Sequence, residues 1–425
     1  MRILAVNPWI TDFAAYDFWL KPYGFLVLLT YLKNQGHEID YIDCLDRKIS
    51  HDRYGRGKFY SIQLTKPAAT SHIPRIYKRY GITINQFQAK LENKKPDVIL
   101  LTSSMTYWYK GLVNISKILK ARFPGTPIIL GGTYASLCYN HASKNTACDF
   151  VYKNDCLEDF FTQIKCKYQP KDLLSTLPEY DFFYNSLEYI VLRTTWGCPM
   201  RCSFCAIAKL YPKFLRLGDD KITDFIKKYS DSGMVNFVFY DDALIYKPED
   251  AKKLFSKILK LKRNLNFHTP NAIHLRFLDQ DLACLLKRAG FINPHFGLEV
   301  LDKKLQKLWG KDKIKKENLK EKIDLLKKAG YKKGGFSMYL LLGYPGQDIK
   351  QLKQDIDFLN SQGAKISLSE FSPVPGTDIF NEYCPDLSEP LLQNNSIFNF
   401  FNANQLKEIQ EIKNYTKKLN SCFSL

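Results

Sequence analysis

The chain has 425 residues, of which 45% are hydrophobic and 14% aromatic, a composition that excludes a disordered protein and allows two domains with cores of their own. No apolar run reaches the roughly 18 residues that span a bilayer, and the N-terminus lacks the pattern of a secretory signal, so we expect a cytoplasmic protein without a transmembrane segment. The net charge is +19, but the lysines are densest from Lys303 to Lys333, in helical spacing with apolar residues, which predicts a basic surface and no specific nucleic-acid site.

Residues 1–165 alternate predicted strands with predicted helices. Strands are expected at 2–7, 37–43, 97–102, 127–130 and 150–152, helices at 22–35, 82–94 and 110–122, and a long irregular insertion at 47–75. This alternation favours a parallel sheet with right-handed crossovers, which is a doubly wound, Rossmann-like α/β domain.

Ligands of doubly wound sheets bind beyond the carboxyl ends of the strands. The loops expected at that edge place hydroxyls, glycines and an aromatic ring there: Ser103, Ser104, Gly131, Gly132 and Tyr134. They indicate a nucleotide-like ligand, and a turn without a ligand is the alternative. The aromatic stretch 12–24 follows the first strand and is either ordinary loop packing or a wall of the same cavity.

The stretch around which the chain is organised follows a predicted linker at 166–187. Cys198, Cys202 and Cys205 lie within eight residues, directly after an apolar predicted strand at 189–195. Gly197 and Pro199 disfavour a helix there, which predicts a loop around a metal centre. Three thiolates are one fewer than a four-iron cluster normally takes, so one iron would keep an open position. A structural zinc site is the alternative, but it needs a fourth nearby Cys or His.

Six strand–helix units are expected in residues 188–380. Their strands are predicted at 189–195, 236–242, 266–274, 293–300, 335–342 and 365–371, which are two units fewer than a closed eight-stranded barrel has. The tail, residues 381–425, is expected to hold one helix at 404–419 that caps the barrel or closes the substrate entrance.

The motif Cys-x3-Cys-x2-Cys, with Phe204 before its last cysteine, resembles that of the radical S-adenosylmethionine (SAM) superfamily. The resemblance implies a partial (β/α)6 barrel and a [4Fe–4S] cluster on Cys198, Cys202 and Cys205. The cluster would cleave SAM to a 5′-deoxyadenosyl radical, with electrons from a donor such as flavodoxin or ferredoxin. By the same resemblance, SAM would be bound near the strand ends by Phe204, Tyr240, Asp241, Asp242, Asn271 and Glu299.

A Rossmann-like domain directly ahead of such a barrel resembles the cobalamin-binding domain of the cobalamin-dependent subclass. The segments 96–104 and 127–132 match that domain's third and fourth strands with their loops, which implies cobalamin at Ser103, Ser104, Gly131, Gly132 and Tyr134. The Asp-x-His-x-x-Gly signature is absent, so no histidine ligand to cobalt is expected.

The sequence therefore predicts a cobalamin-dependent radical SAM enzyme that methylates an unactivated carbon of a small molecule or lipid, with no catalytic residue identified. Three alternatives stay open: a rearrangement or ring-forming radical SAM enzyme, a tRNA methylthiotransferase-like enzyme, and a cobalamin sensor without catalysis. The second alternative would require another cysteine triplet, whereas Cys44, Cys138, Cys148 and Cys156 are unevenly scattered.

Overall fold

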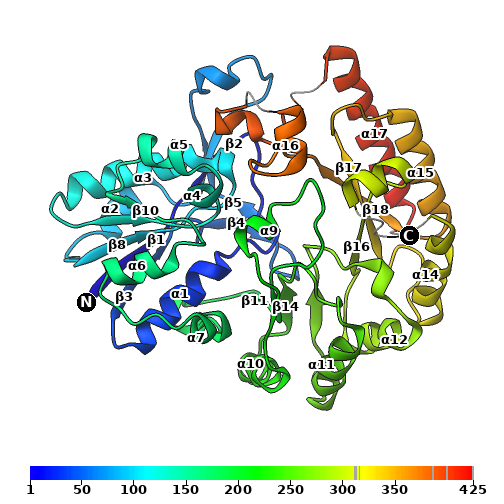
Figure 1. The fold of residues 1–425 in the computed structure, drawn as a ribbon, viewed down its shortest axis with the longest axis horizontal. Helices are drawn as coiled ribbons and strands as arrows, with labels where there is room; N and C mark the ends of the chain where they lie inside the picture. The colour runs from blue at the N-terminus through cyan, green and yellow to red at the C-terminus, as the bar shows by residue number, and fades with distance from the viewer. Residues whose placement is uncertain (311–313, 315, 385–386, 399–400, 424–425) are drawn as a thin grey trace. The chain divides into compact units, whose positions relative to one another are not determined.

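The computed structural model describes residues 1–425 except 311–313, 315, 385–386, 399–400 and 424–425. The chain divides into two compact units (Figure 1). Unit 1 is Met1–Glu188 with Pro385–Ile397, and unit 2 is Tyr189–Cys384 with Phe398–Leu425. Among the helices that the structure describes, none has both the length and the apolar character needed to cross a bilayer.

Unit 1 is built on one parallel sheet. Its five strands, in spatial order, are β3 (Glu38–Asp43), β1 (Arg2–Asn7), β8 (Val98–Leu101), β9 (Ile128–Leu130) and β10 (Phe150–Val151). Each predicted strand of residues 1–165 is present to within one or two residues. The order reverses between β1 and β8, which makes that edge the topological switch point of a doubly wound sheet.

Helices cover both faces of this sheet (Figure 1). They are α1 (Tyr23–Asn34), α2 (Ile84–Lys90), α3 (Tyr109–Arg122), α4 (Thr133–Leu137), α5 (Tyr139–Asn145) and α6 (Leu157–Gln163). Alternate strand residues such as Leu4, Ile99 and Leu130 share one buried cluster with Phe87 of α2 and Ile115 of α3. The apolar side chains on one face of the strands and on one face of α3 therefore pack in the same core.

The expectation of an irregular insertion at 47–75 is wrong. The antiparallel pair β4 (Lys48–His51) and β5 (Gly57–Phe59) lies in it, and so does β6 (Ser61–Gln63), which joins β7 (Lys78–Tyr80) and β2 (Ile10–Asp12) in a small antiparallel sheet. A 3-10 turn, η1 (Ala68–Thr70), completes the region. These strands have three or four residues and alternate charged with apolar side chains only briefly, so they carry little sequence signal.

The segment expected as a linker, 166–187, is part of unit 1. It contains α7 (Pro170–Ser175) and α8 (Tyr180–Phe183). Tyr180 is fully buried, and the Tyr184 hydroxyl donates a 2.7 Å hydrogen bond to Asp43 at the end of β3. Aromatic packing therefore fixes this stretch to the first unit.

Unit 2 contains all six expected strands. They form two parallel three-stranded sheets: β11 (Ile190–Leu192), β14 (Asn236–Phe239) and β15 (Asn266–His268), then β16 (His295–Glu299), β17 (Ser337–Leu342) and β18 (Lys365–Glu370). Two isolated parallel bridges lie between the sheets: Ile273, after β15, pairs with Phe296 of β16, and Phe267 of β15 pairs with Phe291, which precedes β16.

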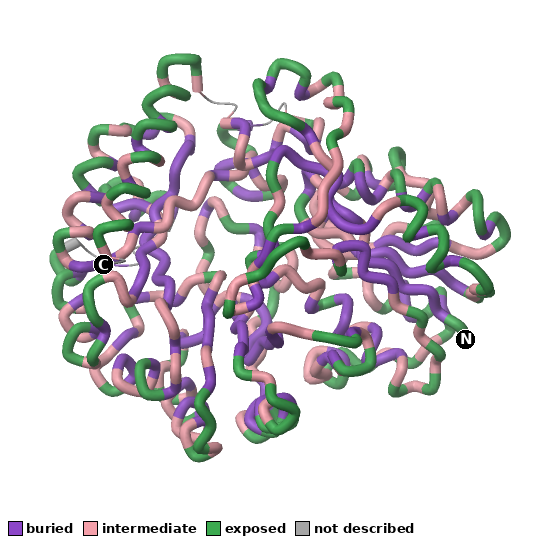
Figure 2. Tube along the Cα trace, turned by 180° about the vertical axis from the view of Figure 1, so that it is seen from behind, coloured by how far each residue is buried: buried purple, intermediate pink, exposed green. Residues whose placement is uncertain are grey.

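Helices alternate with these strands and lie outside them (Figure 1): α10 (Asp219–Asp231), α11 (Pro248–Lys260), α12 (Gln280–Ala289), α14 (Lys316–Lys328) and α15 (Ile349–Ser361). Figure 2 shows the strands mostly buried and the helices exposed on their outer sides. The arrangement brings the carboxyl ends of the strands to one edge, where α/β folds carry their sites.

The tail is divided between the units, with α16 (Asp378–Tyr383) before the part that returns to unit 1 and α17 (Ala403–Ser421) after it. The predicted tail helix is confirmed by α17. The Asn420 side chain donates to the Ile366 carbonyl at 2.8 Å and accepts from the Ile366 N–H at 2.9 Å. It thereby satisfies the free edge of β18, which would otherwise present unpaired backbone groups.

Candidate functional site

The cysteine loop is closed at its base by a short antiparallel pair. β12 (Thr195–Trp196) pairs with β13 (Leu215–Arg216), so both ends of the loop are held together. Gly197 has φ +72°, and a Cβ there would lie 2.5 Å from the Lys213 carbonyl oxygen. Only glycine therefore allows the two ends of the loop to cross this closely.

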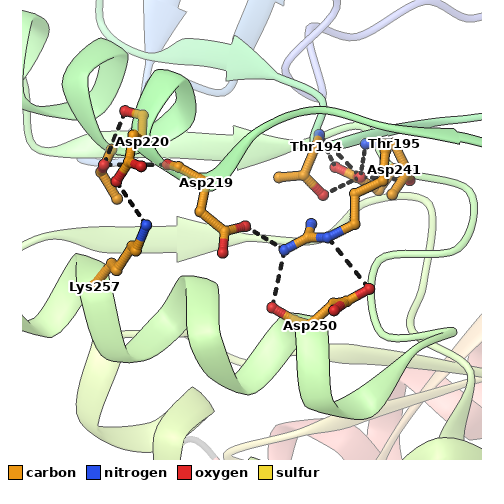
Figure 3. Close-up of polar contacts among 9 residues, drawn as sticks. Thr194, Thr195, Asp219, Asp220, Asp241, Asp250 and Lys257 are labelled. Carbon is orange, nitrogen blue, oxygen red and sulfur yellow. Dashed lines mark hydrogen bonds and ion pairs between the residues drawn. The ribbon is translucent and has the colours of Figure 1, made fainter.

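Asp241, which follows β14, holds the start of the loop (Figure 3). Thr194 and Thr195 each donate their backbone N–H and their hydroxyl to its carboxylate, at distances from 2.6 to 3.1 Å. Asp241 is 2% exposed, and burial raises its pKa above the usual value for an aspartate. Its carboxylate is thus committed to the loop base, and we assign it a positioning role in place of the expected contact with SAM.

A second clamp holds the other end of the loop base. Arg216 of β13 pairs with Asp219 at the start of α10, and it donates to the Asp250 carbonyl oxygen at 2.9 Å. Its Nε lies 3.6 Å from the Asp250 carboxylate. In Figure 3, Asp219 and Asp250 approach this guanidinium from two different helices. The loop base is therefore fixed to α10 and α11 as well as to β14.

Asp242 is neutralised by Arg193 from the strand before the loop. The ion pair measures 2.7 Å, and both side chains are about 10% exposed. Burial alone would lower the pKa of Arg193, but Asp242 raises it above its usual value. The guanidinium also lies over the ring of Trp196, 5.2 Å from its centroid. This ion pair thus lies buried next to the start of the cysteine loop.

The three cysteines are close to one another and are not buried in the core. Cys198 and Cys202 are half-buried and Cys205 is exposed. Although the residue as a whole is exposed, burial of its thiol is the main cause that raises the pKa of Cys205 to about 12, and Cys202, Asp242 and Cys198 contribute to this rise in that order. Ligation of a metal centre therefore includes the loss of this thiol proton.

The middle of the loop is anchored at Ser203. Its N–H donates to the Trp309 carbonyl at 2.9 Å, and its hydroxyl donates to the Leu308 carbonyl at 3.0 Å. The next residue, Phe204, packs against the cluster that contains Trp309 and Tyr344. These contacts hold the loop between its second and third cysteines.

The cysteine loop offers three thiols as candidate ligands of a metal centre. Among the residues that the structure describes, no three His, Cys, Asp or Glu side chains converge on one point as ligands of one metal ion. The three thiols are nonetheless near enough for two of them to raise the pKa of the third. Three thiolates are one fewer than a [4Fe–4S] cluster normally takes, which would leave one iron for another ligand.

His274 lies in this site, although the sequence did not single it out from His268 and His295. Its Nε2 is 3.8 Å from the Cys198 sulfur and 3.2 Å from the Asp242 carbonyl oxygen. His274 and Cys198 are 76 positions apart in the chain, so no local sequence pattern could have predicted that they lie close together.

The remaining residues expected to bind SAM lie at the carboxyl ends of neighbouring strands. Asn271 donates to the Tyr240 carbonyl at 2.8 Å, which ties the segment after β15 to the end of β14. Glu299 ends β16 with φ +61°, where the register with β17 shifts. Ala272, beside Asn271, also has a positive φ of 65°. Non-glycine residues in this region are strained, and such strain collects at functional sites.

Unit 1 has a hollow at its topological switch point. Its empty volume, open solvent included, is about 350 Å³, and the loops after β1 and β8 supply most of its lining. The lining residues are Asn7, Pro8, Trp9, Ile10, Leu45, Ser103, Ser104, Met105, Trp108, Tyr109 and Tyr134. Parallel sheets with this strand order bind ligands at this place.

Ser103 joins the two loops that carry the expected ligand residues. Its hydroxyl donates to the Gly131 carbonyl at 2.7 Å and accepts from the Ala135 N–H at 3.2 Å. Gly132 has φ +95°, and a Cβ there would lie 2.4 Å from the Ser103 carbonyl oxygen. A Cβ on Gly131 would meet no atom within 4 Å. The glycine pair thus permits close packing on one side and leaves open backbone on the other.

Aromatic rings form much of the lining. Tyr109 and Tyr134 stack with centroids 5.6 Å apart, and the Tyr134 hydroxyl is paired with His141 at 2.7 Å. Trp9 is 1% exposed, and its indole N–H has no hydrogen-bond partner among the described residues. The hollow is therefore lined by buried aromatic side chains, and one of them, Trp9, has a buried donor without a partner among the described residues.

The family comparison identifies unit 2. Residues 192–359 match the model of the radical SAM superfamily. Unit 2 therefore contains a radical SAM domain. Members of that superfamily use a [4Fe–4S] cluster and SAM, and an electron donor must reduce the cluster. The domain in residues 192–359 therefore implies a cluster, SAM and an electron donor.

Two kinds of relatives extend the comparison to the whole chain. The chain is 25% identical over 308 residues to bacteriochlorophyllide d C-12(1)-methyltransferase of Chlorobaculum tepidum, and the match covers 67% of this chain and 65% of that relative. The fold of this chain is similar to that of TsrM of Kitasatospora setae, a radical SAM methyltransferase. The structure with tryptophan and a SAM analogue gives a TM-score of 0.66 at 13% identity, over 90% of this chain and 75% of that chain.

A second TsrM structure, with cobalamin and a [4Fe–4S] cluster bound, gives a TM-score of 0.65 at 14% identity, over 90% of this chain and 77% of that chain. Both structural matches show that this chain shares an α/β fold with TsrM along most of its length.

The site residues predicted in unit 1 lie at the hollow or beside it. Ser103, Ser104 and Tyr134 line the hollow, and Gly131 and Gly132 form the turn next to Ser103. Sequence reasoning placed the loop 7–9 at this edge without selecting Trp9 as a binding residue, and it missed the lining residues Trp108 and Tyr109. Trp9 directly follows Asn7 and Pro8 after the first strand, so its position at the ligand edge was the available signal. None of the aromatic stretch 12–24 lines the hollow.

Proposed function

We propose that this protein is a cobalamin-dependent radical SAM methyltransferase that acts on a carbon atom of a small molecule or lipid. The observation that carries the proposal is the aromatic hollow at the switch point of unit 1, in a chain whose other unit holds the cysteine loop. Dinucleotide and corrinoid cofactors both use this edge of doubly wound sheets. The relatives named above are methyltransferases, one of them with cobalamin bound, which favours the corrinoid.

The lining fits part of a corrinoid. The stacked rings of Tyr109 and Tyr134 present a flat apolar wall, and the unpaired Trp9 indole N–H can donate to one of the amide groups that surround a corrin ring. No histidine belongs to the described lining. The open backbone at Gly131 leaves room for the nucleotide tail.

In unit 2, Cys198, Cys202 and Cys205 would hold the cluster. We assign Phe204, Tyr240, Asp242, Asn271 and Glu299 to the surroundings of SAM, because they lie on the cysteine loop or at strand ends next to it. When bound, the cluster supplies an electron for cleavage of SAM, and cobalamin carries the methyl group. The protein holds these groups in place and keeps water from them.

The names of the relatives favour a small-molecule substrate. One relative is named for a bacteriochlorophyllide and the other was solved with tryptophan as substrate. Because the chain spans only 65% of the length of the bacteriochlorophyllide enzyme, we propose the class of reaction and not that substrate.

Anaerobic production of the full chain with hydroxocobalamin, followed by reconstitution with iron and sulfide, tests the proposal. We expect a corrinoid in the visible spectrum, 5′-deoxyadenosine when SAM and dithionite are added, and S-adenosylhomocysteine from methyl transfer. SAM cleavage without a bound corrinoid would contradict the methyltransferase and favour a rearrangement or ring-forming enzyme. A bound corrinoid without SAM cleavage would favour a sensor.

A further inference from the structure

One short segment near the C-terminus belongs to unit 1, although the chain before and after it belongs to unit 2. We call its described part, residues 387–397, the strap. It contains the 3-10 turn η5 (Pro390–Gln393), in which Leu391 is 3% and Gln393 1% exposed. Leu391 joins the same buried cluster as Trp9, Tyr109 and Tyr134. The strap is therefore an integral part of the core behind the hollow.

Glu389 of the strap fixes Tyr109. Its Oε1 accepts the Tyr109 hydroxyl at 2.9 Å and the backbone N–H of Leu391 at 3.0 Å. One carboxylate oxygen thus caps the 3-10 turn and holds a ring that lines the hollow. The ring of Tyr109 in turn stacks on Tyr134. Burial and then the Glu389 charge raise the pKa of Tyr109 well above its usual value, so this hydroxyl stays protonated and donates.

Asn394 fixes Trp108 through a buried carboxylate. Its side-chain N–H donates to Asp12 Oδ1 at 2.7 Å, and the Trp108 indole N–H donates to Asp12 Oδ2, also at 2.7 Å. The amide oxygen of Asn394 accepts the N–H and the hydroxyl of Ser396, each at 2.8 Å. These acceptor contacts define which way the amide points, so the donor faces Asp12.

We propose that the strap sets the aromatic wall of the cofactor hollow, with Glu389 and Asn394 as positioning residues for Tyr109 and Trp108. This inference rests on the proposed function for the identity of the ligand, a corrinoid. Tyrosine and tryptophan each have one polar group that fixes the orientation of the ring. For these two adjacent rings both groups are held from the strap, directly or through Asp12. A binding wall needs such supporting contacts to keep its geometry.

A purely structural role makes a different prediction. If the strap only covers the core, the large side chains Leu391 and Ile397 would matter and the polar pairs would not. The test therefore uses Glu389→Ala and Asn394→Ala, with Glu389→Gln as the conservative variant that keeps an acceptor. Ser388→Ala is the matched control, because Ser388 is an exposed residue of the same strap. Tyr109→Phe removes the hydroxyl and keeps the ring.

The experiment measures two quantities on the full chain: the Kd for hydroxocobalamin, and amide hydrogen exchange of residues 105–112. Glu389→Ala, Asn394→Ala and Tyr109→Phe are expected to weaken binding roughly tenfold, because each leaves a buried polar group unpaired. The two alanine variants should also speed exchange at 105–112. Glu389→Gln should recover most of both losses, and Ser388→Ala should change neither.

Wild-type affinity and unchanged exchange in both alanine variants would overturn the role of the strap. If the wild-type chain itself bound no hydroxocobalamin, the proposed function would fail, and the exchange data would still decide whether the strap orders residues 105–112. If Glu389→Ala did not fold, Tyr109→Phe would test the same hydrogen bond from its other end.

Discussion

The backbone N–H of Thr195 donates a 2.7 Å hydrogen bond to Oδ1 of Asp241, and Thr195 lies three residues before the first cysteine of the loop. Asp241, which follows β14, thus orients the start of the cysteine loop, which follows the neighbouring strand β11. Because Asp241 receives four donors from Thr194 and Thr195, the geometry of the loop depends on a carboxylate outside it.

Replacement of Asp241 by Ala should therefore destabilise the loop and lower its cluster content. The variant leaves buried N–H and hydroxyl groups unpaired, at a cost of about 3 kcal/mol in the free energy of unfolding. Asp241→Asn keeps one acceptor and should lose less. Urea unfolding and iron content of the reconstituted protein measure both effects.

Asp220→Ala is the control for this substitution. Asp220 forms an exposed ion pair with Lys257 near the same loop base (Figure 3), and exposed pairs contribute little. We expect no measurable change in stability or iron content. An equal loss of iron in Asp220→Ala and Asp241→Ala would contradict a specific role for Asp241.

The ligand assignment predicts that Cys202→Ala abolishes the visible absorbance of the cluster and SAM cleavage, while hydroxocobalamin still binds to unit 1. The physical reason is the loss of one of only three thiolates. Cys284→Ala, at a half-buried cysteine of α12, should retain the cluster. The assignment is wrong if Cys202→Ala still cleaves SAM.

His274 is expected to tune the cluster. A ring N–H near the Cys198 sulfur stabilises negative charge on the thiolate, and hydrogen bonds to cluster sulfurs set reduction potentials. His274→Leu should shift the potential by about 40 mV to the negative side if the bond contributes about 1 kcal/mol. His274→Gln, which keeps a donor, should shift it less. A potentiometric titration followed by electron paramagnetic resonance measures this, and equal potentials in all three proteins would rule out the contact.

Gly132→Ala should impair the hollow of unit 1. The added Cβ would meet the Ser103 carbonyl at 2.4 Å in a backbone conformation with φ +95°, so we expect a loss of at least about 1 kcal/mol in stability together with weaker binding of hydroxocobalamin. Gly125→Ala is the control, because a Cβ there meets no atom within 4 Å. Absorbance titration and thermal unfolding test the pair, and equal behaviour of both variants would contradict the role of Gly132.

The sequence predicted what depends on local pattern. Most strands of the three parallel sheets could be predicted because they are apolar runs, and the three cysteines could be recognised because they are neighbours in the chain. Contacts between distant residues gave no such signal: Asn394 and Asp12 are separated by 382 positions. The short strands within 47–75 were hidden by their charged residues. At Asp241 the sequence located an acid at a strand end, but it could not show that the threonines already satisfy its carboxylate.

The central claim is that the cysteine loop holds a four-iron cluster with one iron available to SAM. The most direct measurement is the electron paramagnetic resonance spectrum of the reduced, reconstituted protein before and after SAM is added. We predict a changed spectrum with SAM, followed by release of 5′-deoxyadenosine. An identical spectrum in the presence of SAM, with no cleavage product, would contradict the claim.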